Sequence, residues 1–334
     1  MYVKTVEMHT GGGPVRILLS GFPKRKFETL LEHRNYVREH LDHFRKALIL
    51  EPRGHHDMYG VIIVPPTLPN ADIAVLFMDN SGYSTMCGHA VISMARYAVD
   101  HGYVKTLKSP ETKVDIQCPC GMVSAYVKYD GTKTGATRFI SVPAFVYATD
   151  VELPMKKFGT LKVDISYGGG FYVFISAEKL GLDVRKTKLK DLVQVAGDIT
   201  DVAKEHIKIE FPESKEQAFI YGTILTDGRD SNIKATSINL CVFADRQVDR
   251  SPCGSGTTAR MALLYHKGLI GLNQSRYFQS SKTGSSFSSK IVRDTTSGGR
   301  KAVNVEVSGQ GFYLGTSTYT LEVGDKLGHG FSIK

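Results

Sequence analysis

Hydrophobic and polar residues alternate along much of the chain in a pattern that predicts two strand-rich halves with a similar order of elements. Residues 3–20 have the pattern of a strand, a triple-glycine turn and a second strand, and residues 161–176 repeat it around a second triple glycine. A helical pattern follows each copy. Residues 26–49 predict one amphipathic helix, because their apolar positions recur at helical spacing, and residues 177–182 and 189–195 predict helical stretches in the second half.

Each half also contains a Cys-Gly pair that opens a helix of small residues. The first helix follows Cys87 and the second follows Cys253, and each ends at a glycine. We therefore expect two α+β domains, residues 1–152 and 153–334, in which the C-terminal strands can cross back to the first half. A chance similarity of two unrelated halves is the alternative. The strands expected after the helices lie at 114–129, 137–151, 286–293 and 301–323, and the serine-rich residues 280–289 predict a hairpin loop.

The composition is that of an ordinary globular protein. Of the 334 residues, 42% are hydrophobic and 22% are charged, which excludes collagen-like, coiled-coil and disordered classes, and the length suits two domains. No apolar run approaches the ~20 residues that cross a membrane. The N-terminus alternates like a strand and lacks the apolar core of a signal peptide. We therefore expect a cytoplasmic protein.

The net charge of +9 is spread along the chain, and its densest stretch, Lys24–Lys26, lies at the start of the predicted helix at 26–49. Binding to nucleic acid or to a membrane needs a clustered basic patch, so we favour a solvated basic surface and expect neither partner. The five cysteines are an odd number, and no export signal is expected, which favours reduced thiols over a disulfide framework.

The two Cys-Gly pairs are the strongest chemical signal in the chain. A thiol at a helix N-terminus faces exposed backbone amides and the positive end of the helix dipole, which favour the thiolate, and the following glycine lets a ligand approach those amides. One such pair is a weak signal, because structural cysteines are common at helix ends. Two pairs at equivalent positions of similar halves predict that Cys87 and Cys253 face one another across an interdomain cleft.

Two opposed thiols suit proton exchange at the α-carbon of an amino acid. One cysteine removes the α-proton as a thiolate, and the other returns a proton to the opposite face as a thiol. The negative charge that develops spreads into the substrate carboxylate, where helix-terminal amides stabilise it. Because these amides do the work of an electron sink, we expect no Schiff-base cofactor and no metal.

The segments around the two cysteines resemble the signature motifs of the proline racemase family, which includes proline racemases, hydroxyproline 2-epimerases and trans-3-hydroxy-L-proline dehydratases. The motifs are Met86–His89 and Asp249–Gly256, and the resemblance extends along nearly the whole chain, including residues 51–60 and 221–228. It implies a fold like that of diaminopimelate epimerase, with two pseudo-symmetric α/β domains, each a curled sheet around a central helix, and an active site between them. In overall sequence the chain is closest to animal dehydratases of the family.

The resemblance also implies roles for individual residues. Cys87 and Cys253 match the two proton-transfer thiols of the family. Gly88 and His89 match the substrate-binding positions after the first thiol, with His89 near the ring amine and the carboxylate of the substrate.

Three more substrate-binding residues are implied around the second thiol. Asp249 matches the residue that accepts a hydrogen bond from the substrate amine, and Gly254 and Ser255 match the pair that donates backbone amides.

Two positions depart from the family's pattern. The dehydratases are expected to have Thr at position 253, where this chain has Cys, the residue of the racemases and epimerases. Position 13 is glycine, whereas the family usually has Glu in a Gly-Glu-Pro turn ahead of Arg16. The second departure puts the function of that carboxylate in doubt.

The overall resemblance and the site residue thus indicate different activities, and we give more weight to the site. The leading expectation is a cofactor-independent proline racemase or hydroxyproline 2-epimerase that inverts the α-carbon between Cys87 and Cys253. The alternatives are a trans-3-hydroxy-L-proline dehydratase, in which Cys87 removes the α-proton and the 3-hydroxyl leaves, and an inactive homologue that binds proline-like ligands. The expected partner is a small molecule, proline or a hydroxyproline, and a second copy of the chain in a homodimer is a further candidate.

Other motifs are better explained by packing or turn geometry. Cys118 and Cys120 lack the second pair of ligands of a zinc site, and Cys241 has the setting of a buried strand residue. His55 and His56 are adjacent and diverge on an extended chain, which favours a loop over a metal site. The triple glycines lack the Lys-Ser/Thr of a phosphate loop.

Overall fold

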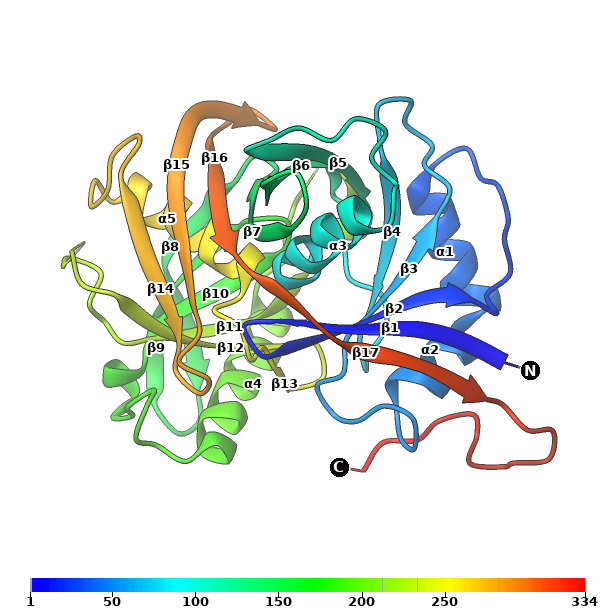
Figure 1. Cartoon of the computed structure of the whole chain (residues 1–334). Coiled ribbons are helices and arrows are strands. Elements are labelled where there is room, and N and C mark those ends of the chain that lie inside the picture. Colours follow the sequence, from blue (N-terminus) through cyan, green and yellow to red (C-terminus); the bar gives the residue numbers. More distant parts are fainter. Residues whose placement is uncertain (1, 212, 233, 334) are drawn as a thin grey trace. The chain divides into compact units, whose positions relative to one another are not determined.

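Figure 1 shows a computed structural model of the chain, which describes residues 2–211, 213–232 and 234–333. The chain forms two compact units: Met1–Phe139 with Gly309–Lys334, and Ile140–Ser308. The sequence placed the division at 152/153. That position lies inside a strand of the second unit, β8 (Phe145–Met155), so the first division falls before this strand.

The first unit combines a mixed sheet with helices. Its helices are α1 (Leu30–His40), α2 (Asp42–Ile49) and α3 (Gly88–Asp100). Its strands are β1 (Tyr2–Thr10), β2 (Gly13–Ser20), β3 (Gly60–Val64), β4 (Ile73–Met78), β5 (Glu111–Cys118), β6 (Gly121–Tyr129), β7 (Thr134–Ile140, which ends at the boundary) and β17 (Gly311–Thr320).

The strands of the first unit pair in the order β17-β1-β2-β3-β4-β5-β6. The β2–β3 and β4–β5 pairs are parallel, and the other pairs in this order are antiparallel. A parallel pair needs a crossover connection, which α1 and α2 supply between β2 and β3, and α3 supplies between β4 and β5. Figure 1 shows the red strand β17 beside the dark blue strand β1, so the two ends of the chain share one sheet edge.

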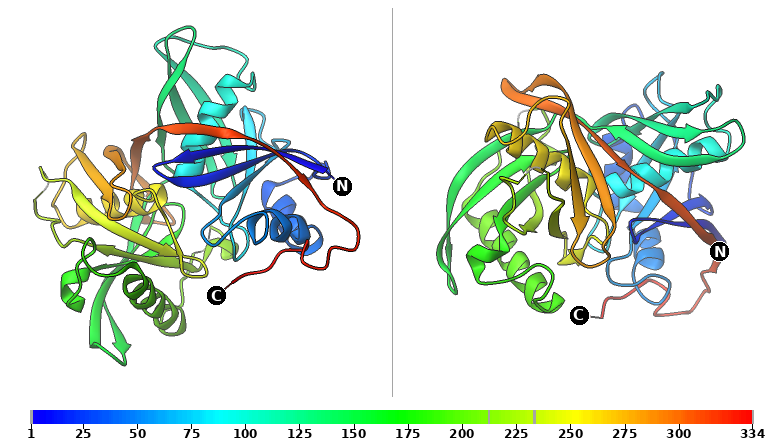
Figure 2. Two further views of the ribbon diagram at one scale, coloured as in Figure 1. Left: turned by 60° about the horizontal axis from the view of Figure 1, so that its bottom comes forward. Right: turned by 60° about the vertical axis from the view of Figure 1, so that its left-hand side comes forward.

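Helices cover both faces of this sheet, and its strand β4 is therefore buried along its whole length. Ala74, Leu76 and Met78 of β4 belong to one buried cluster, which also contains apolar residues of α1 and α2. Successive residues of a strand point to opposite faces, so the other residues of β4 face the side away from α1 and α2. On that side α3 packs against β1, β2, β5, β6 and β17 (Figure 2), and most of its residues are buried.

The second unit also combines a mixed sheet with helices. Its helices are α4 (Leu189–His206), α5 (Gly254–His266) and the short 3₁₀ helices η1 (Ala177–Leu180) and η2 (Lys215–Gln217). Its strands after β8 are β9 (Gly159–Tyr167), β10 (Phe171–Ser176), β11 (Ile220–Thr226), β12 (Ser237–Phe243), β13 (Gln247–Val248), β14 (Ser275–Ser280), β15 (Ser286–Ser297) and β16 (Arg300–Gly309).

The second unit repeats the pairing pattern of the first. Its strands pair in the order β8-β9-β10-β11-β12-β14-β15-β16, in which β10–β11 and β12–β14 are parallel and the others antiparallel. α4 lies in the first parallel crossover and α5 in the second. Like α3, α5 packs against several strands and is buried over most of its length. The α+β fold of two similar halves, each a sheet around a central helix, confirms the expectation from sequence.

One predicted helix is divided in two. The helix expected over 26–49 begins only at Leu30, because Thr29 and Glu32 form a capping box: the Thr29 side chain accepts from the Glu32 amide and the Glu32 carboxylate accepts from the Thr29 amide. Leu41 then leaves the helical conformation, with φ −125° and ψ 13°, and separates α1 from α2.

Two further predictions concern the second unit. Residues 177–182 form only the short helix η1, whereas the stretch expected at 189–195 extends to His206. The hairpin loop predicted for the serine-rich segment is confirmed, because Phe278 of β14 pairs with Phe287 of β15 across it.

Each triple-glycine turn packs against the first turn of the buried helix in its own unit. A Cβ at Gly13 would lie 3.2 Å from Cδ2 of His89 in α3. A Cβ at Gly168 would overlap the carbonyl oxygen of Ser255 and lie 2.5 Å from the amide nitrogen of Ala259, both in α5. Neither glycine has a positive φ, so the close approach of the helix, and not the backbone conformation, explains the absence of a side chain.

Among the described residues, no helix is both long enough and apolar enough to cross a lipid bilayer.

We expect Gly168→Ala to lower the free energy of unfolding by roughly 1–3 kcal/mol, because the atoms that its Cβ would meet are mainly helix backbone and cannot move aside. Gly170→Ala is the matched control in the same turn. A Cβ at Gly170 would lie 3.6 Å from the ring of Tyr172, an ordinary contact, so this variant should stay within about 0.5 kcal/mol of wild type. Urea unfolding of the full chain measures both values, and equal stabilities would contradict the close approach.

Candidate active site

Cys87 lies immediately before the first helical residue of α3, at the position that the sequence predicted. Its side chain is buried and its backbone is extended, with φ −143° and ψ 108°. The first amides of a helix have no acceptor within the helix, so the thiol lies at a group of backbone donors and at the positive end of the helix dipole. Gly88, the first residue of α3, is also buried and adds no side chain over these amides.

His89 brings an imidazole to the Cys87 thiol. Nδ1 of His89 lies 3.2 Å from Sγ of Cys87, and Nε2 lies 3.3 Å from the carbonyl oxygen of Pro14. Because a carbonyl oxygen only accepts, these partners assign the hydrogen of the neutral ring to Nε2 and leave Nδ1 as the acceptor that faces the thiol. An imidazole in this position can take the thiol proton and then stabilise the thiolate.

Two residues that the sequence did not single out support this pair. The Tyr59 ring meets the His89 ring edge-on, with 5.0 Å between their centroids, and the Tyr59 hydroxyl is hydrogen-bonded to the Ser84 hydroxyl. Tyr59 belongs to the segment 51–60 that carries the family resemblance, which is the signal that could have found it. Gly13 lies against the Cγ–Cδ2 side of the His89 ring. The Cβ of the Glu that the family usually has at this position would therefore contact His89.

Cys253 lies at the equivalent position before α5, but its backbone differs from that of Cys87. Its φ is +68°, a conformation that a residue with a Cβ rarely adopts and that is concentrated at functional sites. Gly256 in the first turn of α5 leaves room for two side chains: a Cβ there would overlap Cδ1 of Ile224 and lie 2.8 Å from Sγ of Cys253. The close approach of Ile224 and of the thiol to the helix explains this glycine.

Hydroxyl groups surround the Cys253 thiol. Its Sγ lies 3.8 Å from the hydroxyl oxygen of Tyr172 and 4.0 Å from that of Ser255, and these two hydroxyls are hydrogen-bonded at 2.7 Å. Burial raises the pKa of Tyr172 well above its usual value, and the nearby Cys253 and Cys241 thiols act in the same direction, so the phenol keeps its proton. The sequence did not predict Tyr172, although it closely follows the second triple glycine.

Asp249 is held by the turn that leads to Cys253. Its Oδ1 accepts hydrogen bonds from the amide of Ser251 at 2.8 Å and from the Ser251 hydroxyl at 2.7 Å. The Ser251 hydroxyl in turn accepts from the amide of Cys253 at 3.1 Å. The predicted site residues therefore gather in two groups, one in each unit: Cys87, Gly88 and His89 at the start of α3, and Asp249, Cys253, Gly254 and Ser255 at the start of α5.

The remaining motifs lie elsewhere in the fold. Cys241 is fully buried in β12, and His55 and His56 lie in the loop between α2 and β3. Within the described part of the chain, no three His, Cys, Asp or Glu side chains are grouped as ligands of a metal ion.

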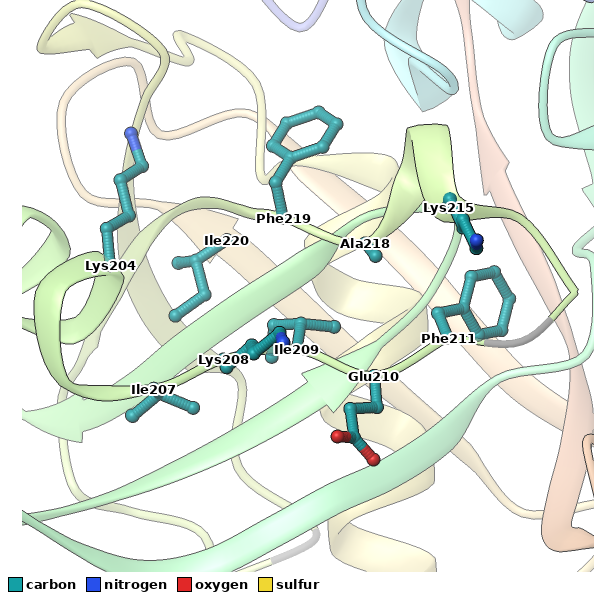
Figure 3. Close-up of a pocket in the computed structure, with 10 residues that line it drawn as sticks. All are labelled: Lys204, Ile207, Lys208, Ile209, Glu210, Phe211, Lys215, Ala218, Phe219 and Ile220. Atoms are coloured by element: carbon teal, nitrogen blue, oxygen red, sulfur yellow. The ribbon is translucent and has the colours of Figure 1, made fainter.

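A cavity of about 810 Å³ lies in the second unit, away from the predicted residues. Figure 3 shows its apolar lining after α4, which includes Ile207, Ile209 and Phe211, with Lys204 and Lys208 near it. None of the described residues around it brings a thiol, an imidazole or an Asp carboxylate to its lining, and these are the groups that the predicted proton transfer needs.

A chain with two similar α+β halves, each with a buried helix opened by a cysteine, has the architecture of the amino-acid racemases and their relatives. The model of the proline racemase family matches residues 5–332, and the chain belongs to this family. The resemblance noted in the sequence is thereby confirmed.

Individual relatives include both hydro-lyases and epimerases. The chain is 56% identical over 327 residues to a trans-L-3-hydroxyproline dehydratase of Saccoglossus kowalevskii, covering 98% of this chain and 100% of the relative. It is 41% identical over 333 residues to a 3-hydroxyproline 2-epimerase of Burkholderia multivorans, covering 99% and 98%. A probable proline racemase of Agrobacterium radiobacter K84, solved with bound carbonate, has a TM-score of 0.92 at 25% identity, covering 99% of this chain and 96% of that one.

We expect Gly13→Ala to slow the alkylation of Cys87 by iodoacetamide roughly threefold to tenfold. The new methyl group must displace the His89 ring, which weakens its hydrogen bonds to Cys87 and Pro14 by about 1 kcal/mol. Gly82→Ala is the control, because a Cβ there meets nothing within 4 Å. The rates follow from mass spectrometry of the peptide that contains Cys87. An unchanged rate in Gly13→Ala would show that the position of His89 does not control the reactivity of the thiol.

Proposed function

We propose that the chain is a cofactor-independent trans-3-hydroxy-L-proline dehydratase. The observation that carries the proposal is the 56% identity, over 98% of the chain, to a dehydratase, against 41% to an epimerase. This evidence favours dehydration over the inversion that was the leading expectation from sequence. That expectation depended on Cys253 alone, and a thiol at this position is compatible with both reactions.

The stereochemistry of the substrate explains why one thiol is enough for dehydration. In the trans isomer, the α-hydrogen and the 3-hydroxyl both lie on the ring face opposite the carboxylate, and so on the same face as one another. A single group on that face can take the hydrogen from C2 and give it to the oxygen that leaves C3. Inversion, in contrast, needs a second proton donor on the opposite face.

We assign the base to Cys87, because it is the thiol that is paired with an imidazole. His89 can accept the thiol proton through Nδ1, whereas the groups around Cys253 are the Tyr172 phenol, which keeps its proton, and the Ser255 hydroxyl. Cys87 therefore has the partner that a base needs, and Cys253 has partners that support a protonated group.

The reaction then proceeds in balanced steps. The Cys87 thiolate takes the proton from C2, and the electron pair of the broken C–H bond spreads into the carboxylate. The pair then forms a C2–C3 double bond while the C3–O bond breaks, and the leaving oxygen takes up the proton from the Cys87 thiol and departs as water. The thiolate is restored. The unsaturated ring amine tautomerises to a cyclic imine.

Helix amides stabilise the charge that develops on the substrate carboxylate. We assign this role to the first amides of α3 at Gly88 and His89, and of α5 at Gly254 and Ser255, because such amides point out of the helix and carry its positive dipole. Asp249 is assigned to the ring amine. Its Oδ1 is already oriented by Ser251, so the carboxylate is held in place before substrate binds.

Epimerisation of a hydroxyproline is the second candidate, and the setting of Cys253 favours it. Core packing alone does not explain a buried thiol with a strained backbone and two hydroxyl neighbours, and such strain is concentrated at functional sites. The two candidates share the first step, proton removal by Cys87, and differ in what happens to the resulting carbanion.

We expect the wild-type protein to convert trans-3-hydroxy-L-proline to a cyclic imine that borohydride reduces to proline. Cys87→Ala should lower this rate by on the order of 10³-fold, because the base is lost. Cys253→Thr should keep dehydration within about tenfold of wild type while removing inversion of any proline substrate, since a hydroxyl is too weak an acid to reprotonate the α-carbon efficiently. Cys241→Ala, which removes a buried thiol that has no assigned role in the reaction, is the control.

Chiral chromatography of the products of reactions run in D₂O distinguishes dehydration, inversion and the absence of any reaction. Inversion without water loss would replace the proposal with the second candidate. The chain would be an inactive binding homologue if it showed neither dehydration nor inversion, exchanged no deuterium at the α-carbon, and still bound the substrate.

A further inference from the structure

The turn that leads into α5, residues 249–253, ends in the strained residue of the site. Cys253 has a φ of +68° and is buried. A residue with a Cβ keeps such a conformation only where its surroundings hold the backbone from more than one side. Specific contacts must therefore hold this turn in its shape.

The peptide group between Pro252 and Cys253 is held at both ends. Its carbonyl oxygen accepts a hydrogen bond from Nδ2 of Asn239 at 3.0 Å. Its N–H group, on Cys253, donates to the Ser251 hydroxyl at 3.1 Å. Because φ of Cys253 is the rotation about the bond that follows this peptide group, two hydrogen bonds at opposite ends of the group restrict that rotation.

The strand β12 holds the start of the turn as well as its end. The amide of Asp249 donates to the carbonyl oxygen of Cys241 in β12 at 3.1 Å, two residues along the strand from Asn239. The first of these anchors is a backbone bond, which no substitution of a side chain removes. The second depends on the identity of residue 239.

Asparagine is an unusual residue for position 239. It is 2% exposed inside a strand that is buried along its whole length and is paired with β11 on one side and β14 on the other. Asparagine is depleted in strands, and burial of an amide costs free energy unless the amide is hydrogen-bonded. Among the described residues its Oδ1 has no hydrogen-bond partner, so the bond to Pro252 is the one that justifies the side chain.

We propose that Asn239 is a positioning residue for substrate binding. By holding the Pro252 carbonyl, it keeps the turn in the shape that presents the Asp249 carboxylate and the first amides of α5. The inference rests on the proposed function, which assigns these groups to the ring amine and the carboxylate of the substrate. Asn239 acts through the turn, and direct contact with the substrate is not part of its role.

The first unit needs no equivalent side chain. Cys87 has an extended backbone, which any residue adopts. The segment before it is attached through the backbone, because the amide of Cys120, in the tight turn between β5 and β6, donates to the carbonyl oxygen of Thr85 at 3.1 Å. Loss of the Asn239 amide should therefore disturb the site of the second unit and leave that of the first unchanged.

The first experiment measures the alkylation of both site cysteines by iodoacetamide in Asn239→Leu, whose side chain is of similar size and cannot donate. We expect Cys253 to react roughly tenfold faster than in the wild type, because the turn opens more readily, and Cys87 to react at the wild-type rate. Asn304→Leu is the matched control: Asn304 is also buried, and its Nδ2 donates to the carbonyl oxygen of Ser141 at 2.7 Å. It should leave both rates unchanged.

The second experiment measures the binding of trans-3-hydroxy-L-proline by calorimetry in a Cys87→Ala parent, which lacks the proposed base and does not consume the substrate. We expect Asn239→Leu to weaken binding roughly tenfold relative to this parent. Asn239→Asp keeps the shape and donates to Pro252 only while its carboxyl is protonated. Its affinity, relative to the parent at each pH, should be close to one at about pH 5 and fall as the pH rises to about 8.

Three results would overturn the proposal: an unchanged alkylation rate at Cys253 in Asn239→Leu, equal acceleration at both cysteines, or faster alkylation of Cys253 without weaker binding. If Asn239→Leu does not fold, the pH dependence of Asn239→Asp decides, and a flat ratio would count against the inference. A parent that binds L-proline but not trans-3-hydroxy-L-proline would reject the proposed function alone. The effect of Asn239→Leu on L-proline binding would then test the positioning role.

Discussion

The close approach of a glycine turn to the first turn of a buried helix is the constraint on which both units depend. In each unit a sheet wraps one helix, and the N-terminus of that helix meets a triple-glycine turn. Helix N-termini carry amides without intrahelical acceptors, and burial of such amides is costly unless they find partners. A buried helix start that leaves no room for side chains on the facing turn is therefore suited to an anionic ligand. The substrate carboxylate is the ligand that we assign to these amides.

The two units use this common frame differently. Cys87 has an imidazole as neighbour, and that imidazole is oriented by the Pro14 carbonyl and by the edge of the Tyr59 ring. Cys253 has the Tyr172 and Ser255 hydroxyls as neighbours and a left-handed backbone. An imidazole can exchange a proton with a thiol near neutral pH, whereas a phenol with a raised pKa cannot. The duplicated fold thus supports two thiols with unequal chemistry, and this inequality fits a reaction in which one thiol does most of the proton transfer.

The residue at position 253 shows how much a single side chain can decide. Taken alone, a second cysteine indicates inversion, because inversion needs an acid on each face of the α-carbon. The higher identity to a dehydratase, 56% against 41% to an epimerase, instead favours dehydration, for which one thiol on one face is sufficient. The two indications are compatible once both reactions are seen to begin with the same proton removal. In the mechanism that we propose, position 253 governs the fate of the carbanion and has no part in its formation.

The sequence by itself determined the α+β class, the internal repeat and the residues at the start of each buried helix, because these depend on local patterns: period-two strands, Cys-Gly helix starts and glycine turns. It also gave the family, through the resemblance of the two cysteine motifs to those of known members. It missed the break at Leu41, since the pattern of apolar residues continues through it. Only the tertiary structure showed that Gly13 touches His89, that Tyr172 lies over Cys253, and that the Cys118–Cys120 turn is attached beside Cys87. These contacts join residues far apart in the chain, and their geometry arises from packing between elements, which no local spacing encodes.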